Sequence, residues 1–479
     1  MNYRMIKYTL GWLMLFEAGF FLVPMITAVV YGEWQSLVAF GISALICLGL
    51  GLLCVWKKPE KTGIFAREGF VIVSLSWILL SIFGAIPFML SGATTNFFDA
   101  LFETASGFTT TGSSIFREVE SLPHAILMWR SFTHWVGGMG VLVFIMVFLP
   151  LGGGQNMHIM LAESTGADVS KLVPKVKQTA VILYSIYLGL TVLLFIALLI
   201  SEMPVFEAIN TAFATAGTGG FGFRNDGFAS FSAIQQIVVT VGMLMFSVNF
   251  NSYYLILKLK FKDAFNAEVR TFFLIVAAVI AVITIDIYQS YDSVWEAMRH
   301  AAFTVASLIS TTGFGTENFD LWPSLSKTLL VLIMFIGGCA GSTAGGMKVS
   351  RWLISIKGFV REIFTLIHPK QVKKITLDSR PVDKEVVKSV SSYIVCFVML
   401  FVGSLLVISL DGRDLVTNFT AVAATINNIG PGLAGVGPTA NFADFSNLSK
   451  LMLTFNMIAG RLELFPMLIL LSPNTWKKA

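Results

Sequence analysis

The sequence has few charged residues and few residues suited to holding a metal. Only 13% of its 479 residues are Asp, Glu, Lys or Arg, about half the share found in soluble proteins. Its four cysteines and five histidines are scattered, with no Cys-x-x-Cys pair and no Cys/His cluster. These absences argue against a soluble globular protein, a disulfide framework and a zinc site.

Sequence signatures of catalysis and of nucleotide binding are also missing. No nucleophile–base arrangement, no HExxH, no phosphate loop and no glycine-rich dinucleotide fingerprint between a strand and a helix occurs. We therefore expect no enzyme and no organic cofactor on this chain. Any control by a nucleotide would have to come from a partner protein.

Apolar residues dominate instead. They make up 55% of the chain, with 42 Phe and 41 Gly, and the mean hydropathy is +0.77. A membrane-spanning helix needs about 20 mostly apolar residues, so we expect an all-α polytopic membrane protein with ten transmembrane helices. The ten predicted spans are residues 8–31, 36–56, 69–98, 131–162, 178–201, 227–257, 271–288, 328–347, 389–410 and 451–471.

The basic residues predict the orientation. If both termini are cytoplasmic, 25 of the 33 Lys and Arg fall on the inner side, as the positive-inside rule requires. This bias explains the net charge of +5 without a nucleic-acid partner. The most basic stretch, residues 350–388, has two open interpretations: a topology signal that contacts lipid headgroups, or a docking surface for a cytoplasmic partner.

Four segments of equal length align with one another on the predicted outer side. They read DALFETASGFTTTG (99–112), EAINTAFATAGTGG (207–220), HAAFTVASLISTTG (300–313) and TNFTAVAATINNIG (417–430). Each segment follows a long apolar stretch. It has a sequence compatible with one short helix, and it ends on a glycine. The repeating unit is therefore helix, short re-entrant helix, glycine-rich segment, helix, and it follows two leading helices that lack it.

Non-helical backbone at membrane depth survives only where protein or a water-filled path surrounds it. Glycine and threonine after a short helix allow carbonyl oxygens to turn into a narrow lumen, and four such segments predict a ring of carbonyls of the kind that replaces the water around K⁺. Four tight loops at helix ends are the alternative. The repetition favours one central pore built from four pseudo-symmetric units.

The repeats divide the chain into five parts. We expect two N-terminal helices at 1–60, pore repeat one at 61–170, pore repeat two at 171–262, pore repeat three at 263–365 and pore repeat four at 366–479.

The repeated segments resemble the filter segments of the Trk/Ktr/HKT potassium transporter superfamily. The resemblance rests on TASGFTTTGSS, TAGTGGFG, LISTTGFGT and INNIGPGL, and on WRSFTHWVGGMG (129–140), GGCAGSTAGGMKVSR (337–351) and FNMIAGRLELF (455–465). It covers essentially the whole chain. The two leading helices are more similar to the Trk-type membrane subunit (TrkH/TrkG) than to the shorter KtrB type.

The resemblance implies uptake of K⁺, and of Rb⁺, across the bacterial inner membrane. It also implies a homodimer with a pore in each protomer, regulated by a cytoplasmic TrkA-type ring that binds NAD(H) or ATP/ADP. K⁺ would be bound in a selectivity filter as the transported ion. The expected filter residues are Thr110, Thr111, Gly112, Thr218, Gly219, Gly220, Thr311, Thr312, Gly313, Asn428, Ile429 and Gly430.

Only one glycine recurs at the matching position of every filter segment. The residues before it differ, being Thr111, Gly219, Thr312 and Ile429. We expect such a filter to hold fewer well-defined ion sites than one with four identical strands, and to exclude Na⁺ less strictly.

A second glycine-rich segment interrupts the predicted span 328–347. Glycine costs about 1 kcal/mol relative to alanine inside a helix, so the segment is either a close helix crossing or a broken helix. The resemblance favours a broken helix whose loop gates the pore. The expected gate residues are Gly337, Gly338, Ala340, Gly341, Ser342, Thr343, Ala344, Gly345, Gly346, Lys348 and Arg461.

Several charged residues within the spans have two interpretations. Lys348 either extends to the inner interface or holds the loop through carbonyl contacts. Arg461 costs about 3 kcal/mol in a span unless it meets a partner or water; it either acts in the pore or forms a buried salt bridge. Glu103 either attracts cations at the entrance or pairs with Arg130, and Asp99 either shares that role or caps its helix.

Two alternatives to a passive K⁺ pathway remain. A symporter coupled to H⁺ or Na⁺ would need a titrating carboxylate in the membrane, for which Glu103 and Glu463 are candidates. A polytopic membrane enzyme would account for the charges in the spans but not for the four repeated segments.

Overall fold

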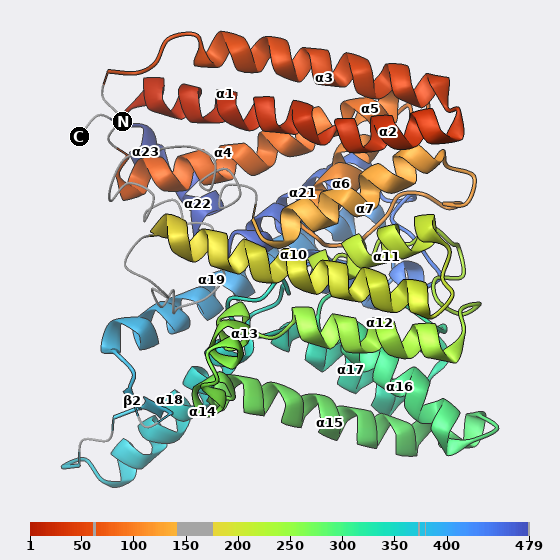
Figure 1. Cartoon of the computed structure of the whole chain (residues 1–479). Helices are drawn as coiled ribbons and strands as arrows, with labels where there is room; N and C mark the ends of the chain where they lie inside the picture. Colours follow the sequence, from red (N-terminus) through yellow and green to blue (C-terminus); the bar gives the residue numbers. More distant parts are fainter. Residues whose placement is uncertain (61–63, 141–175, 372–373, 379, 478–479) are drawn as a thin grey trace.

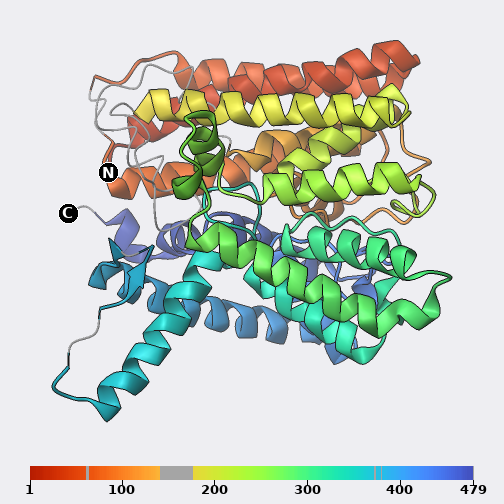
Figure 2. The same cartoon turned by 60° about the horizontal axis from the view of Figure 1, so that its bottom comes forward.

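The computed structural model describes residues 1–60, 64–140, 176–371, 374–378 and 380–477. Apart from a hairpin of two short strands, β1 (Thr376–Leu377) and β2 (Arg380–Pro381), all regular structure in these residues is helical. The long helices run side by side in one bundle, and both termini lie at the same end of it (Figures 1 and 2). The all-helical architecture is as predicted.

Six helical stretches in the described residues are long and apolar enough to cross a membrane. They are α1–α2 (Tyr3–Tyr31), α3 (Trp34–Val55), α4–α5 (Ala66–Leu90), α10 (Val176–Ile200), α15 with η1 (Ala267–Ser290), and α19 with η3 (Lys384–Asp411). Each agrees with one of the predicted spans. Their apolar side chains are exposed on the outside of the bundle, where lipid is the expected solvent.

The other predicted spans are not continuous helices. They contain α7 (His124–Gly138), α12 (Ala233–Phe246) with α13 (Phe250–Leu257), α17 (Ser324–Ile336), and α21 (Asn447–Arg461) with α22 (Phe465–Leu471). The two helices of the pair α12–α13 meet at 92°. Continuous spans over 227–257 and 451–471 were therefore wrong, because apolar composition does not reveal where backbone hydrogen bonding stops. Most of the predicted span 131–162, and the predicted boundary at 170/171, lie outside the described residues.

Four short helices lie inside the bundle, one in each predicted repeat. They are α6 (Phe97–Phe108), α11 (Val205–Gly217), α16 (Val294–Ile309) and α20 (Leu415–Ile426). Each packs between the helices that precede and follow it in the chain. Each also packs against the second helix of the preceding unit: α7 against α11, α12 against α16, α17 against α20, and α21 against α6. The last of these contacts closes the arrangement into a ring.

Polar side chains begin three of these short helices. Asn96, Ser293 and Asp414 accept hydrogen bonds from backbone N–H groups in the first turns of α6, α16 and α20, as good N-caps do. The side chain and the backbone N–H of Thr417 both donate to Asp414 and hold the pKa of that carboxyl below its usual value. The prediction that Asp99 caps α6 was wrong, since Asn96 has that role and Asp99 lies in the first turn.

The end of the bundle that carries both termini also carries α18 (Val349–Ile367), which extends away from the bundle (Figures 1 and 2). Its side chains Ile356, Phe359 and Leu366 are exposed. The β-hairpin lies beside the middle of α18, where Lys357 donates to the Thr376 carbonyl at 2.7 Å. The remaining elements are α14 (Phe261–Ala264), η2 (Phe319–Leu321), η4 (Ala434–Val436) and α23 (Pro473–Trp476).

Candidate functional site

The backbone makes the same turn after each of the four short helices. A non-glycine residue with left-handed dihedrals comes first, and a glycine with positive φ follows two positions later. The left-handed residues are Thr110 (φ 56°), Thr218 (55°), Thr311 (59°) and Asn428 (54°). The glycines are Gly112 (82°), Gly220 (76°), Gly313 (88°) and Gly430 (103°), which we call the glycine ring. The shared pattern aligns the second segment on Gly220 and not on its neighbours.

The glycine ring is closed by contacts between neighbouring segments. A Cβ atom built on Gly112 would lie 2.0 Å from the carbonyl oxygen of Gly219, and one on Gly220 would lie 1.8 Å from that of Thr312. The same construction on Gly313 meets the Ile429 oxygen at 2.1 Å, and on Gly430 it meets the Thr111 oxygen at 3.0 Å. Each glycine thus faces the carbonyl of the residue that precedes the next glycine, and the fourth segment returns to the first.

Hydrogen bonds between two side chains support three of the four segments. The hydroxyls of Thr109 and Thr111 lie 2.8 Å apart in the first segment, and those of Ser310 and Thr312 lie 2.7 Å apart in the third. In the fourth segment the Asn428 amide donates to the Thr111 hydroxyl at 2.9 Å. This last bond joins the fourth segment to the first.

The second segment is supported from another helix. His134 on α7 is fully buried; its Nδ1 lies 2.8 Å from the Gly107 carbonyl oxygen and its Nε2 accepts the Phe221 N–H at 3.1 Å. The sequence analysis did not select His134. No spacing rule marks a lone histidine in an apolar helix, so only the folded chain shows its position.

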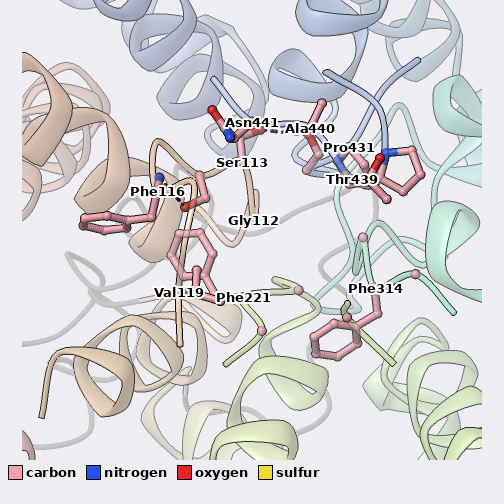
Figure 3. A pocket seen from close by; sticks show the side chains of 18 of the residues that line it. Gly112, Ser113, Phe116, Val119, Phe221, Phe314, Pro431, Thr439, Ala440 and Asn441 are labelled. Carbon is pink, nitrogen blue, oxygen red and sulfur yellow. Dashed lines mark hydrogen bonds between the residues drawn. The ribbon is translucent and has the colours of Figure 1, made fainter. Parts of the chain in front are cut away.

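A pocket of about 150 Å³ lies on one side of the glycine ring. All four ring glycines line it, together with residues that follow them in the chain, and Figure 3 shows Ser113, Phe221, Phe314 and Pro431 around it. Arg117 and Arg224 also line the pocket, but each is paired with a carboxylate, on Asp444 and Glu207 respectively.

A buried ion pair holds the wall of this pocket. Arg130 Nε donates to Glu103 at 2.8 Å, and the two side chains are 2% and 0% exposed. Glu103 also accepts from the Ile115 N–H, while Arg130 donates to the Gly222 carbonyl at 2.8 Å. The predicted pairing of Glu103 with Arg130 is confirmed. A fully buried and neutralised carboxylate does not act as an open cation-attracting group at an entrance.

The segment between α17 and α18 lies on the other side of the ring, against residues that precede the ring glycines. It is non-helical from Gly337 to Lys348, and we call it the intramembrane loop. The Gly345 N–H donates to the Thr311 hydroxyl at 2.6 Å, and the Gly346 N–H donates to the Asn427 carbonyl at 3.0 Å. The loop therefore contacts the third and fourth segments directly.

The intramembrane loop is also bonded to the break between α12 and α13. The Cys339 N–H donates to the Ser247 carbonyl at 2.9 Å, and the Phe250 N–H donates to the Gly341 carbonyl at 3.0 Å. Backbone groups of the intramembrane loop and of the break between α12 and α13 thus hydrogen-bond to one another, as buried backbone requires.

Two cations hold the loop through carbonyl oxygens. Lys348 is 1% exposed and donates to the Ala344 carbonyl, so it does not extend to the interface. Arg461 donates to the Thr343 carbonyl at 2.8 Å and to the Gly137 carbonyl, at the end of α7, at 2.6 Å. The structure therefore places Arg461 between the loop and the first unit.

A carboxylate that the sequence analysis missed joins the loop to the first turn of α18. Glu268, in the first turn of α15, accepts the Ala340 N–H at 2.8 Å and the Ser350 N–H at 3.0 Å through the same oxygen. Glu463, a predicted proton-coupling candidate, instead pairs with Arg351 on α18. No group of three or more potential metal-binding His, Cys, Asp or Glu residues occurs among the described residues.

Comparisons with known proteins agree with this architecture. The family model TrkH, described as cation transport protein, matches residues 35–478. The potassium uptake protein TrkH of the Trk system from Salmonella typhimurium is 34% identical over 486 residues, covering 100% of both chains. The corresponding TrkG from Escherichia coli is 33% identical and covers 99% of each chain.

A solved structure has the same fold. The crystal structure of the potassium transporter TrkH from Vibrio parahaemolyticus superimposes with a TM-score of 0.89 at 33% identity, over 100% of both chains. The likeness thus includes the two leading helices and all four repeated units. On the family match, the full-length relatives and the shared fold, this multi-pass membrane protein belongs to the TrkH family of cation transport proteins.

Proposed function

We propose that the chain takes up K⁺, and Rb⁺, across the bacterial inner membrane through the centre of the glycine ring. The observation that carries this proposal is the closed succession of four glycines, each against the carbonyl of the neighbouring segment. Four carbonyl oxygens at one level replace the hydration shell of a K⁺ ion. The names of its full-length relatives, which are potassium uptake proteins, support the choice of cation.

The short helices add electrostatic support. Each one ends at a segment of the ring, so its partly negative C-terminal end is directed at the same region. The filter in this proposal consists of the twelve expected residues from Thr110 to Gly430, arranged as four similar units around one pore. The interrupted helices α7, α12–α13, α17 and α21–α22 complete ten passes through the membrane.

We propose that the intramembrane loop is the gate. Its bonds to Thr311 and Asn427 place it next to the ring, and the positive charges of Lys348 and Arg461 beside it would oppose cation passage. Transient release of these bonds would open the path. The position of α18 at the end that carries both termini suits contact with a cytoplasmic nucleotide-binding ring of TrkA type, and we expect a homodimer with both termini in the cytoplasm.

The proposed uptake uses the membrane potential, which supplies about 2.3 kcal/mol per charge per 100 mV. The symport alternative would need a carboxylate free to titrate, and Glu103 and Glu463 are both held in ion pairs. Glu17 in α1 is buried and neither of its oxygens has a hydrogen-bond partner in the described part of the chain. Membership in a family of cation transport proteins sets the enzyme alternative aside.

The test is uptake of ⁸⁶Rb⁺ into liposomes that contain the purified chain, with and without the cytoplasmic ring and nucleotide. We expect uptake that external K⁺ blocks and Na⁺ blocks weakly. Absence of uptake with the ring and nucleotide present would reject the proposal. Uptake that requires a pH gradient, and loses this requirement in Glu17→Gln, would instead establish proton coupling.

A further inference from the structure

The four segments that form the glycine ring differ in the side-chain hydrogen bonds of the residue before the glycine. Thr111 and Thr312 each hydrogen-bond through their hydroxyl to a side chain two residues earlier. The matching residue of the second segment is Gly219, which has no side chain and so no such bond. Its carbonyl nevertheless lies against Gly112, in the same relation as the carbonyls of the other three segments.

The space beside Gly219 is filled by the imidazole of His134. A Cβ atom built on Gly219 would lie 2.2 Å from both Cγ and Nδ1 of this ring. Real atoms do not approach so closely, so any side chain at position 219 excludes the imidazole in its present place. The two residues are therefore complementary in shape: one lacks a side chain where the other supplies a ring.

Hydrogen bonding fixes the orientation of the imidazole. Because Nε2 accepts the Phe221 N–H, its lone pair is free of a proton, and Nδ1 carries the hydrogen that is donated to the Gly107 carbonyl. A single neutral ring thus joins the C-terminal turn of α6 to the residue directly after Gly220. It links the first unit of the glycine ring to the second.

We propose that His134 is a positioning residue for ion selectivity, which holds the second segment in place of the missing threonine side chain. Gly219 and His134 form a matched pair: a side chain at position 219 would displace the imidazole, and loss of the imidazole acceptor would leave the Phe221 N–H unpaired. The inference rests on the proposed K⁺ pathway, since it assigns a role within that ring. His134 does not touch the ion path; it acts through the backbone of residues 219–221.

Helix α7 also packs closely against α11 around the histidine. A Cβ atom on Gly217 would lie 2.2 Å from the His134 carbonyl oxygen, so α7 and α11 are in backbone contact at this level. Truncating the imidazole leaves a space between them and an unpaired Phe221 N–H. A buried donor without a partner costs free energy, and the segment is expected to move to regain a bond.

The first experiment compares His134→Gln with His134→Phe by ⁸⁶Rb⁺ uptake against K⁺ and Na⁺ competitors. Glutamine retains one donor and one acceptor, whereas phenylalanine retains a planar ring without either. We expect the ratio of K⁺ to Na⁺ inhibition to fall about tenfold in the phenylalanine variant, the effect of leaving the buried Phe221 N–H unpaired. We expect the ratio to be largely preserved with glutamine. If the phenylalanine variant does not fold, His134→Asn, too short to span both partners, replaces it with the same expectation.

The second experiment tests the pairing itself. Gly219→Thr and His134→Ala are measured singly and together, with the thermal unfolding midpoint recorded for each protein. We expect the double variant to be more selective than either single variant, because threonine then occupies the space of the imidazole.

Two results would overturn the inference. One is a variant at His134 that unfolds at lower temperature but keeps the wild-type selectivity ratio, which would make the histidine a purely structural residue. The other is a double variant that is no more selective than the less selective of the two single variants. A failure of the proposed K⁺ pathway is seen separately, because it shows in the wild-type protein.

Discussion

At the scale of single residues, the four glycines of the glycine ring differ in how much space an added side chain would have. At Gly112, Gly220 and Gly313 an added Cβ would lie 1.8–2.1 Å from a carbonyl oxygen of the next segment. At Gly430 the nearest such atom is 3.0 Å away. The four positions are equivalent in backbone conformation but not in the room around them.

This difference predicts graded effects of substitution. Gly313→Ser is expected to displace the Ile429 carbonyl and to weaken the exclusion of Na⁺ severely. Gly430→Ser requires only a small displacement of the neighbouring backbone, so this variant should lose less selectivity. Competition of Na⁺ with ⁸⁶Rb⁺ uptake measures both. Gly403→Ala in α19, where an added Cβ meets nothing within 4 Å, serves as the matched control. Equal effects at Gly313 and Gly430 would contradict the ring geometry.

Arg461 illustrates how one side chain is tied to the proposed gate. Its bonds to Thr343 on the loop and to Gly137 at the end of α7 hold the loop against the first unit. Arg461→Ala removes both the bonds and the positive charge, so we expect a several-fold rise in ⁸⁶Rb⁺ flux without the cytoplasmic ring. Arg461→Lys keeps the positive charge but not the forked geometry of the guanidinium group. Its flux should lie between those of the wild type and the alanine variant. Wild-type flux in the alanine variant would count against a gating role.

At the scale of secondary-structure elements, the helix that follows each short helix stops or bends in the described structure. The breaks come after Gly138, at residues 247–249, at the intramembrane loop and at residues 462–464. Such breaks are tolerated in a membrane where other protein groups satisfy the freed backbone. Here the loop and the break at 247–249 bond to each other. The apolar composition predicted only one of these interruptions, the glycine-rich one.

Glu268 is expected to keep the loop closed, because one of its oxygens accepts the N–H of Ala340 in the loop and that of Ser350 in the first turn of α18. Glu268→Ala leaves both N–H groups without this partner and should raise the basal flux of ⁸⁶Rb⁺. Glu268→Gln retains an acceptor oxygen at the same place and is the matched control, with flux close to wild type. If the glutamine variant leaks as much as the alanine variant, the charge and not the hydrogen bonding holds the loop.

At the scale of the whole molecule, the ring closes only because the last repeat returns to the first. Lys450 on α21 donates to Asp99 on α6 at 2.5 Å, between side chains that are 4% and 20% exposed. Near the ring, the Ser113 hydroxyl donates to the Gly430 carbonyl at 2.9 Å. These contacts join residues more than 300 positions apart in the chain.

Breaking the Asp99–Lys450 pair is therefore expected to weaken closure of the bundle. Removing one partner of a buried ion pair costs about 3 kcal/mol, while replacing both with neutral residues costs much less. We expect Asp99→Ala to lower the thermal unfolding midpoint in detergent, and the double variant Asp99→Ala/Lys450→Met to recover most of the loss. A double variant as unstable as the single one would show that the pair is not coupled.

The sequence by itself determined the helical class, six of the apolar spans and the glycines that end the four aligned segments with positive φ. Each is a local property: hydrophobic length marks a span, and a residue that must adopt positive φ next to a neighbouring backbone is a glycine. The tertiary structure alone decided the breaks outside the glycine-rich segment and the partners of Glu268, Lys348 and Arg461. It also brought His134 beside Gly219. These features depend on contacts between distant parts of the chain, which leave no periodicity or spacing in the sequence because either partner is meaningful only once the other is in place.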